Sequence, residues 1–201
     1  MLSRHAIPDQ VNECHERLSK IPALASFALG GGTSLALRFA HRRSVDLDFF
    51  TLEEFCVETL VRELGVPEAR IVNQAANSLA LEISSVKVDF LRHHYELLEP
   101  VETRDGFRLL SVPDVAAMKL NAIVNRGSKK DFFDVVELLE HFEVGQLLDW
   151  FELKYPQSDR FIAIRSLSWF GDAESDPEPV SLRNLEWEDV KRRVTRAIAQ
   201  V

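Results

Sequence analysis

Residues 30–50, GGGTSLALRFAHRRSVDLDFF, constrain the fold of this chain more than any other stretch. The apolar run over 25–29 predicts a short buried strand, and the glycines after it predict a tight turn into a helix over 33–40. The alternation in SVDLDFF predicts a second strand over 44–50. Such a succession exposes a backbone turn that a ligand can approach closely.

Asp46 and Asp48 lie two residues apart on the predicted second strand, so they project from one face, about 6.5 to 7 Å apart at the backbone. The residues expected on the opposite, buried face are Val45, Leu47 and Phe49. Parallel carboxylates repel each other unless a cation lies between them, and hard oxygen ligands favour Mg²⁺. Alternatively, both aspartates face water or pair with Arg42 and Arg43.

The glycine turn is suited to phosphate because the free N–H groups and the positive dipole end of a helix N-terminus attract anions. Thr33 and Ser34 add hydroxyl donors at the same place. A Gly-Gly-Thr sequence alone usually marks only a turn, whereas its combination with a following acidic strand is far more specific. We therefore expect Gly31, Gly32, Thr33 and Ser34 to contact phosphate.

Strands dominate the first half of the sequence and helices the second. The remaining elements expected in the first half are helices over 8–19 and 52–64, a hairpin over 78–91 turning at Ser84 and Ser85, and a strand over 106–111. Those expected in the second half are helices over 113–125, 129–142, 145–154, 159–169 and 187–201, with an acidic loop over 172–180. We predict an α+β fold, with a small mixed β-sheet and flanking helices in residues 1–110 and a helical part in residues 111–201 that completes an active-site cleft.

Composition excludes several classes of protein. The 201 residues are 46% hydrophobic, enough for a sizeable core, and the net charge of −8 argues against a general nucleic-acid-coating protein. No apolar run approaches the roughly 18 to 20 residues of a membrane span, and the N-terminus lacks the apolar core of a signal peptide. We expect a cytoplasmic protein with no membrane partner. The basic islands AHRRS, NRGSKK and VKRRVTR still allow an anionic ligand locally.

The segment GGTSLALR followed by HRRSVDLDFF resembles the nucleotidyltransferase-fold enzymes of the AbiEii/AbiGii toxin family, the enzymatic half of abortive-infection and type IV toxin–antitoxin pairs. The pattern of that superfamily is a glycine pair, a short spacer, Asp-x-Asp and a third carboxylate on a later strand. Here 13 residues separate Gly32 from Asp46. The resemblance covers residues 27–139 and implies a nucleotidyltransferase fold.

The third carboxylate that the resemblance implies has two candidates. Asp89 is an acid inside the otherwise apolar strand VKVDFL, whereas Glu82 has an expected cross-strand partner in Lys87. We predict Asp89, for which a solvated hairpin position is the alternative. The metal ligands predicted for two Mg²⁺ ions are Asp46, Asp48 and Asp89.

A second part of the resemblance lies between residues 114 and 139. Its pattern is a helical lysine, a later arginine, and a basic residue with two aspartates opening the next helix, matched by Lys119, Arg126, Lys130, Asp131 and Asp134. Lys119 and Arg126 are seven residues apart on one helix face, so both could reach one polyphosphate, whereas Lys129 is expected in solvent. Alternatively, the basic face is solvated and the two aspartates favour the helix dipole.

Two sets of site residues follow from the motifs and the resemblance. The predicted catalytic residues are Asp46, Asp48, Asp89, Lys119 and Asp131. The predicted nucleotide-binding residues are Gly31, Gly32, Thr33, Ser34, Arg42, Lys119, Arg126 and Lys130.

The resemblance implies a Mg-dependent transfer of a nucleoside monophosphate from an NTP to an acceptor, with release of pyrophosphate. The implied acceptor is RNA, with tRNA 3′ ends as one known class, and the implied partner is an antitoxin. Arg192, Arg193 and Arg196 of the last predicted helix are expected to follow an RNA backbone.

Two alternative functions stay open, namely a small-molecule or protein nucleotidyltransferase and a non-catalytic nucleotide- or partner-binding module. A glycosyltransferase is disfavoured because only 45 residues precede Asp46. The sequence leaves open the preferred base, the oligomeric state and the role of residues 140–201.

Overall fold

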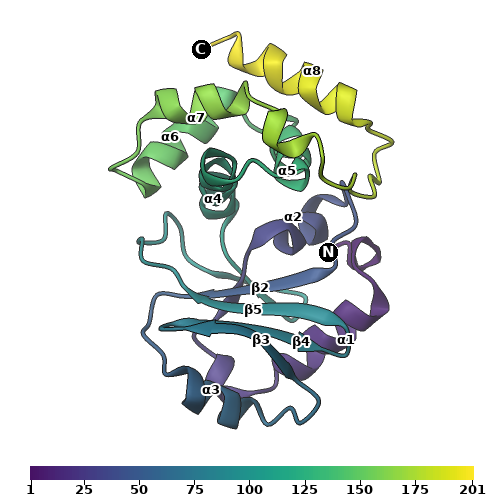
Figure 1. The fold of residues 1–201 in the computed structure, drawn as a ribbon, viewed down its shortest axis with the longest axis vertical. Coiled ribbons are helices and arrows are strands. Elements are labelled where there is room, and N and C mark those ends of the chain that lie inside the picture. Colours follow the sequence, from purple (N-terminus) through teal and green to yellow (C-terminus); the bar gives the residue numbers. More distant parts are fainter.

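Seven strands form one mixed sheet in the first half of the chain, in the order β3-β4-β5-β2-β1-β7-β6. Figure 1 labels the neighbouring strands β3, β4, β5 and β2. The computed structural model describes residues 1–201. The strands are β1 (Ala28–Leu29), β2 (Asp46–Thr51), β3 (Arg70–Ala75), β4 (Ser78–Ile83), β5 (Val86–Arg92), β6 (Glu102–Arg104) and β7 (Phe107–Leu109). β2 runs parallel to β5 and antiparallel to β1. The predicted α+β class with a mixed sheet is confirmed.

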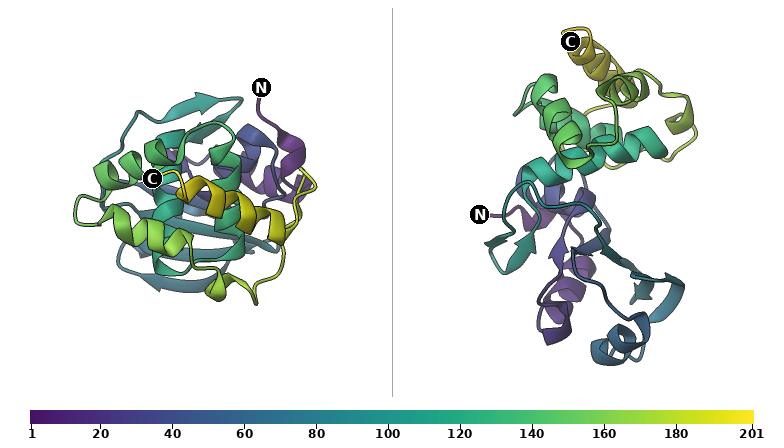
Figure 2. Two further views of the ribbon diagram at one scale, coloured as in Figure 1. Left: turned by 90° about the horizontal axis from the view of Figure 1, so that it is seen from above. Right: turned by 90° about the vertical axis from the view of Figure 1, so that its left-hand side faces the viewer.

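Helices flank the sheet and then build the second half of the molecule, which stands above the sheet in Figure 1 and in the right view of Figure 2. The helices of the first half are α1 (Asp9–Leu18), α2 (Gly31–Phe39) and α3 (Val57–Leu64). Those of the second half are α4 (Val112–Asn125), α5 (Lys129–Leu139), α6 (Val144–Lys154), α7 (Arg160–Leu167) and α8 (Trp187–Ile198). None of the helices combines the length and the apolar character that a membrane crossing requires.

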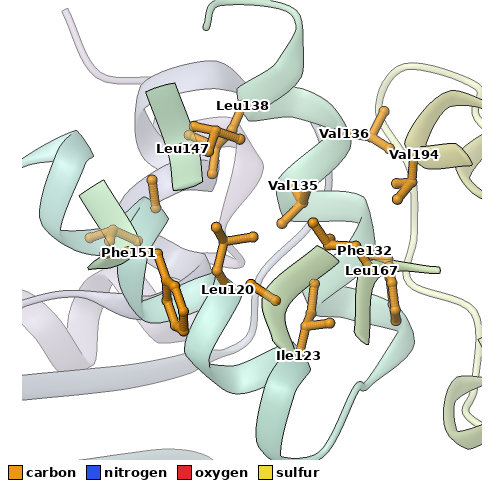
Figure 3. Close-up of a cluster of buried hydrophobic side chains, with 14 of the residues drawn as sticks. Leu120, Ile123, Phe132, Val135, Val136, Leu138, Leu147, Phe151, Leu167 and Val194 are labelled. Atoms are coloured by element: carbon orange, nitrogen blue, oxygen red, sulfur yellow. The ribbon is translucent and has the colours of Figure 1, made fainter. Parts of the chain in front are cut away.

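The hydrophobic core consists of two clusters. One packs on the face of the sheet opposite Asp46 and Asp48, and the other lies mainly within the helical second half of the chain. In the cluster below the sheet, Leu47 and Phe49 of β2 are almost fully buried, and His15 of α1 stacks on Phe107 with ring centroids 3.8 Å apart. In the cluster above it, α4 and α5 pack against α6, α7 and α8 (Figure 3). β2 therefore buries one face and leaves Asp46 and Asp48 on the other.

The hairpin predicted over 78–91 is confirmed, since β4 and β5 pair antiparallel and Glu82 lies opposite Lys87. Its turn residues Ser84 and Ser85 both have positive φ, 48° and 65°, as a two-residue hairpin of the right twist requires. The helices predicted in the second half are also confirmed, with ends that differ by a few residues. The division of the chain at residue 110 stays a prediction.

Three local expectations are wrong. The sequence predicts no strand at β3 or β6, and both are present. β3 is exposed along its whole length and β6 has only three residues, so neither shows an alternating pattern. The helix predicted over 52–64 begins only at Val57, since Phe55 N–H donates to Asn77 Oδ1 instead of joining a helix. Val45 is 56% exposed, because β2 begins one residue after it.

Candidate active site

The three glycines after β1 are needed because side chains crowd each of them. Gly31 has φ of +59°, and a Cβ there would overlap Asp48 Oδ2, while a Cβ on Gly32 would overlap the Arg42 guanidinium. A Cβ on Gly30 would lie 2.8 Å from the Phe50 ring. The turn thus brings the first residues of α2 against the carboxylate face of β2.

The parallel pairing of β2 with β5 brings the three predicted carboxylates together. Asp48 lies directly opposite Asp89, and Asp46 lies opposite Lys87. Burial raises the pKa of Asp48, and the charges of Asp89 and Asp46 raise it further while Lys119 opposes them. Like charges therefore accumulate on this face of the sheet.

Two lysines bind the carboxylates that flank Asp48. Lys87 Nζ lies 2.7 Å from Asp89 Oδ2, and Lys130 Nζ lies 3.4 Å from Asp46 Oδ2. Asp89 Oδ1 is buried and has no hydrogen-bond partner. Glu82 does lie opposite Lys87, as predicted, but the two side chains form no ion pair, because the Glu82 carboxylate binds Arg70 of the neighbouring strand β3.

A cavity of about 450 Å³ lies over these carboxylates and is lined by residues from both halves of the chain. Nine of the predicted site residues line it, namely Gly31, Gly32, Arg42, Asp46, Asp48, Asp89, Lys119, Arg126 and Lys130. Larger hollows lie beside α3, α7 and α8, but none of them contains this set of residues. The structure thus gathers predicted residues from Gly31 to Lys130, 99 positions apart, into one volume.

Three predicted site residues have side chains outside this cavity. Thr33 is 1% exposed, and its hydroxyl lies 2.8 Å from Ser44 Oγ and donates to the backbone carbonyl of Asp46. Ser34 is fully buried, and its hydroxyl donates to the carbonyl of Gly31 at 3.0 Å. These hydroxyls brace the turn and the start of β2, so the expectation that they face phosphate does not agree with the structure.

Asp131, the third of these residues, is fully buried at the start of α5. Its carboxylate accepts hydrogen bonds from Lys119 Nζ at 2.8 Å and Ser128 Oγ at 2.6 Å, and lies 3.3 Å from Arg126 Nε. The side chains of Lys119 and Arg126 point the same way, as predicted, but both of them contact the Asp131 carboxylate. Asp131 therefore positions the side chains of two cationic residues that line the cavity.

Asp134, one turn later on α5, is the centre of a buried ionic cluster. Its carboxylate oxygens lie 2.7 Å from His41 Nε2, 2.7 Å from Arg42 Nε and 2.6 Å from Lys119 Nζ. Burial opposes ionisation, but Arg42 and Lys119 outweigh it and hold the pKa of Asp134 well below its usual value. Sequence reasoning missed His41, because a histidine inside a basic island carries no periodic signal.

The expectation that Lys129 lies in solvent is wrong. Lys129 is 7% exposed, and its ammonium donates to the carbonyl of Asp176 at 2.8 Å and lies 5.3 Å from the centre of a Trp187 ring. The segment that follows α7 folds back over the start of α5 and covers this lysine. Lys129 therefore joins α5 to the C-terminal part of the chain.

The carboxylates fit a hard divalent cation by their chemistry, since they offer oxygen donors on neighbouring strands and one buried oxygen without a partner. No three His, Cys, Asp or Glu side chains surround a common point. Two of the three carboxylates are bound to Lys87 and Lys130 instead. A metal ion held by Asp46, Asp48 and Asp89 would therefore replace these lysine contacts.

The sequence matches the family described as nucleotidyl transferase AbiEii toxin, type IV TA system, over residues 16–200. The chain belongs to the AbiEii family. The uncharacterized protein aq_aa25 of Aquifex aeolicus is 33% identical to this AbiEii chain, over 94% of the chain and 95% of the relative. AbiEii membership makes the protein a nucleotidyltransferase toxin, a transferase that takes an NTP and a divalent metal, of a type of system that pairs each toxin with an antitoxin.

Solved structures show that this AbiEii chain shares its fold with distant proteins. JHP933 of Helicobacter pylori aligns with a TM-score of 0.59 at 15% identity, covering 100% of this chain and 93% of that one. The nucleotidyltransferase toxin MenT4 of Mycobacterium tuberculosis aligns with a TM-score of 0.57 at 15% identity, covering 96% of this chain and 84% of that one. The resemblance to a nucleotidyltransferase-fold toxin family is thereby confirmed.

Proposed function

We propose that this toxin transfers a nucleoside monophosphate from an NTP to the 3′ hydroxyl of an RNA, with a tRNA end as the expected acceptor. The observation that carries the proposal is the convergence of the glycine turn, Asp46, Asp48 and Asp89 on one cavity. A volume of about 450 Å³ lies within the range of small-molecule sites. The same cavity has cations at its edge, which suits two anionic substrates.

In the proposed reaction the acceptor hydroxyl attacks the α-phosphorus of the NTP. The new bond joins the acceptor oxygen to that phosphorus, the bond to the bridging oxygen breaks, and pyrophosphate leaves. Asp89 accepts the hydroxyl proton, because its Oδ1 is buried without a partner. The N–H groups of Gly31 and Gly32 meet the phosphates, and Lys119 and Arg42 stay oriented by Asp134. Divalent ions on Asp46, Asp48 and Asp89, two in our proposal, supply charge neutralisation when bound.

The rim of the cavity supports an anionic acceptor. Lys87, Arg126 and Lys130 line it with side chains that are 53%, 60% and 45% exposed. The arginines of α8 do not line it, and Arg192 and Arg193 pair with Asp189 and Glu140 at the surface. We therefore expect RNA to meet the rim first, and contact with α8 stays a prediction that reversing its three arginine charges would test.

The decisive experiment incubates the protein with Mg²⁺, each α-labelled NTP in turn, and total cellular RNA, and resolves RNA and protein on one gel. We expect label in RNA with wild-type protein and none with Asp46→Ala. Label in a protein band only would contradict the RNA acceptor. Label in neither fraction with any NTP would contradict nucleotidyl transfer to macromolecules as a whole.

Asp89→Asn should separate nucleotide binding from chemistry. Asparagine keeps the shape and one acceptor oxygen but cannot take the hydroxyl proton, so we expect a rate loss of at least about 100-fold. Affinity for NTP and Mg²⁺, measured by calorimetry, should stay within about tenfold of the wild-type value. Glu82→Gln is the matched control, because Glu82 binds Arg70 outside the cavity and its loss should leave turnover unchanged.

A further inference from the structure

One wall of the cavity is a face of α4 that has no role in the reaction described above. Met118, Asn121, Ala122 and Asn125 line the cavity at helical spacings of three and four residues, so they form one continuous stripe. The opposite side of α4 faces the core, where Leu120 and Ile123 are buried (Figure 3). Met118 of this stripe also packs against the core, whereas the two asparagines face the cavity without taking part in the hydrophobic packing.

Two asparagines in this stripe are unfavourable for the helix itself. Asparagine has a low helix propensity because its side chain competes for backbone hydrogen bonds. Asn125 Nδ2 donates to the backbone carbonyl of Asn121 at 2.7 Å and to Asn121 Oδ1 at 3.2 Å. With the amides in this orientation, Asn121 keeps its N–H donors and Asn125 keeps its carbonyl acceptor for another partner.

Aromatic residues after β5 line the same cavity. The Tyr95 ring lies 4.6 Å from Tyr155 and 5.7 Å from His93, measured between centroids, and meets Tyr155 edge to face. These contacts fix the direction of the Tyr95 ring while it remains half-buried at the cavity wall. Burial, reinforced by Lys154, lowers the pKa of His93 to about 4, so the His93 ring next to Tyr95 is neutral at neutral pH.

We propose that Asn121, Asn125 and Tyr95 form the nucleobase subsite of the nucleotide that this toxin consumes. The base stacks on Tyr95, and its hydrogen-bonding edge meets the free N–H of Asn121 and the free carbonyl of Asn125. The proposal rests on the proposed function, since it places an NTP in this cavity. Because each base orders its donors and acceptors differently, a fixed donor beside a fixed acceptor selects among bases.

The test measures the equilibrium affinity of the protein, with Mg²⁺ present, for each of the four NTPs and for inorganic triphosphate. Wild type should prefer one NTP by about tenfold or more. Asn121→Leu and Asn125→Leu should reduce that preference to within about threefold and leave triphosphate affinity unchanged. Leucine has the same branching as asparagine and the same number of side-chain heavy atoms, and it favours helices, so both variants should melt at or above the wild-type temperature. Tyr95→Ala should weaken the affinity for all four NTPs, whereas Tyr95→Phe, which keeps an aromatic ring, should bind them as wild type does.

Asn73→Ala is the matched control, because Asn73 lies exposed on edge strand β3 away from the cavity. It should bind every ligand as wild type does. Equal wild-type affinity for all four NTPs, or an unchanged preference in both leucine variants, would overturn the subsite while the proposed function stood. Failure of the wild-type protein to bind either NTP or triphosphate would instead overturn the proposed function.

Discussion

Asp48 carries the least compensated charge in the cavity. Its carboxylate has no ion pair or hydrogen bond, lies opposite Asp89 in the strand register, and has a pKa raised first by burial. We expect Asp48→Asn to raise the free energy of unfolding at pH 7 by about 1 kcal/mol and to abolish transfer. Urea denaturation without added metal measures the first effect.

The control for this prediction is Asp46→Asn. Asp46 already has a partner in Lys130, so removing its charge should give a smaller gain in stability. A stability loss in Asp48→Asn would show that the carboxylate is compensated in a way that these contacts do not account for.

Lys119 presents the opposite case, since its ammonium is buried between the carboxylates of Asp131 and Asp134. Replacing it with methionine leaves two buried acids short of a cation, so we expect Lys119→Met to lower the free energy of unfolding by about 3 to 5 kcal/mol. Lys20→Met, at an exposed position, should change stability little. Equal denaturation midpoints for the two variants would contradict the buried cluster.

The residue types of the site could be predicted because Asp-x-Asp, the glycines and Asp89 stand out against their apolar neighbours. Whether a polar side chain faces the cavity or the interior could not. Thr33 and Lys129 look available in the sequence, yet Thr33 binds Ser44 and Lys129 binds the carbonyl of Asp176. Such partners lie on other elements, so local spacing carries no trace of them.

At the scale of elements, α4 and α5 are joined by ionic contacts that should respond to acid. The pKa values of Asp131 and Asp134 lie below the usual carboxyl range, because Lys119 and Arg42 outweigh the effect of burial. The unfolded chain therefore takes up protons first as pH falls, so this stabilisation is complete above about pH 4 and is lost below it.

We expect the free energy of unfolding to fall steeply between about pH 4 and pH 2, measured by urea denaturation at fixed ionic strength. Asp48 has the opposite effect on stability. Because its pKa is raised in the folded state, its ionisation at higher pH lowers the free energy of unfolding. The series is therefore best measured in Asp48→Asn, which removes that contribution. A flat profile over this interval would contradict the depressed pKa values.

The elements that could be predicted are those with one buried face, such as the β4–β5 hairpin and the helix α5. The edge strands β3 and β6 could not, because they are exposed on both faces and are defined mainly by pairing with β4 and β7. The parallel pairing of β2 with β5 is also invisible locally, since it joins strands that are separated by α3 and the strands β3 and β4.

At the scale of the molecule, the cavity is lined both by the sheet and by the helices above it. A nucleotide bound there contacts both halves, so it should stabilise the whole protein against unfolding. At an NTP concentration of 100 times its dissociation constant with Mg²⁺, we expect about 2.7 kcal/mol of added stability, visible as a raised melting temperature.

The control for nucleotide stabilisation is the Asp46→Ala variant at the same NTP concentration, which should gain less. The corresponding nucleoside without phosphates should also give a smaller shift with wild type. If no NTP raised the melting temperature of wild type at any concentration tested, the cavity would not be the nucleotide site.

The cluster around Asp134 also bears on how this protein can change over evolutionary time. One carboxylate binds the adjacent residues His41 and Arg42 and also Lys119 of α4, which lies far from them in the sequence. A replacement at any one of these positions leaves the others with charge that the interior cannot solvate. Lineages descending from this chain should therefore alter the four positions together or keep all of them.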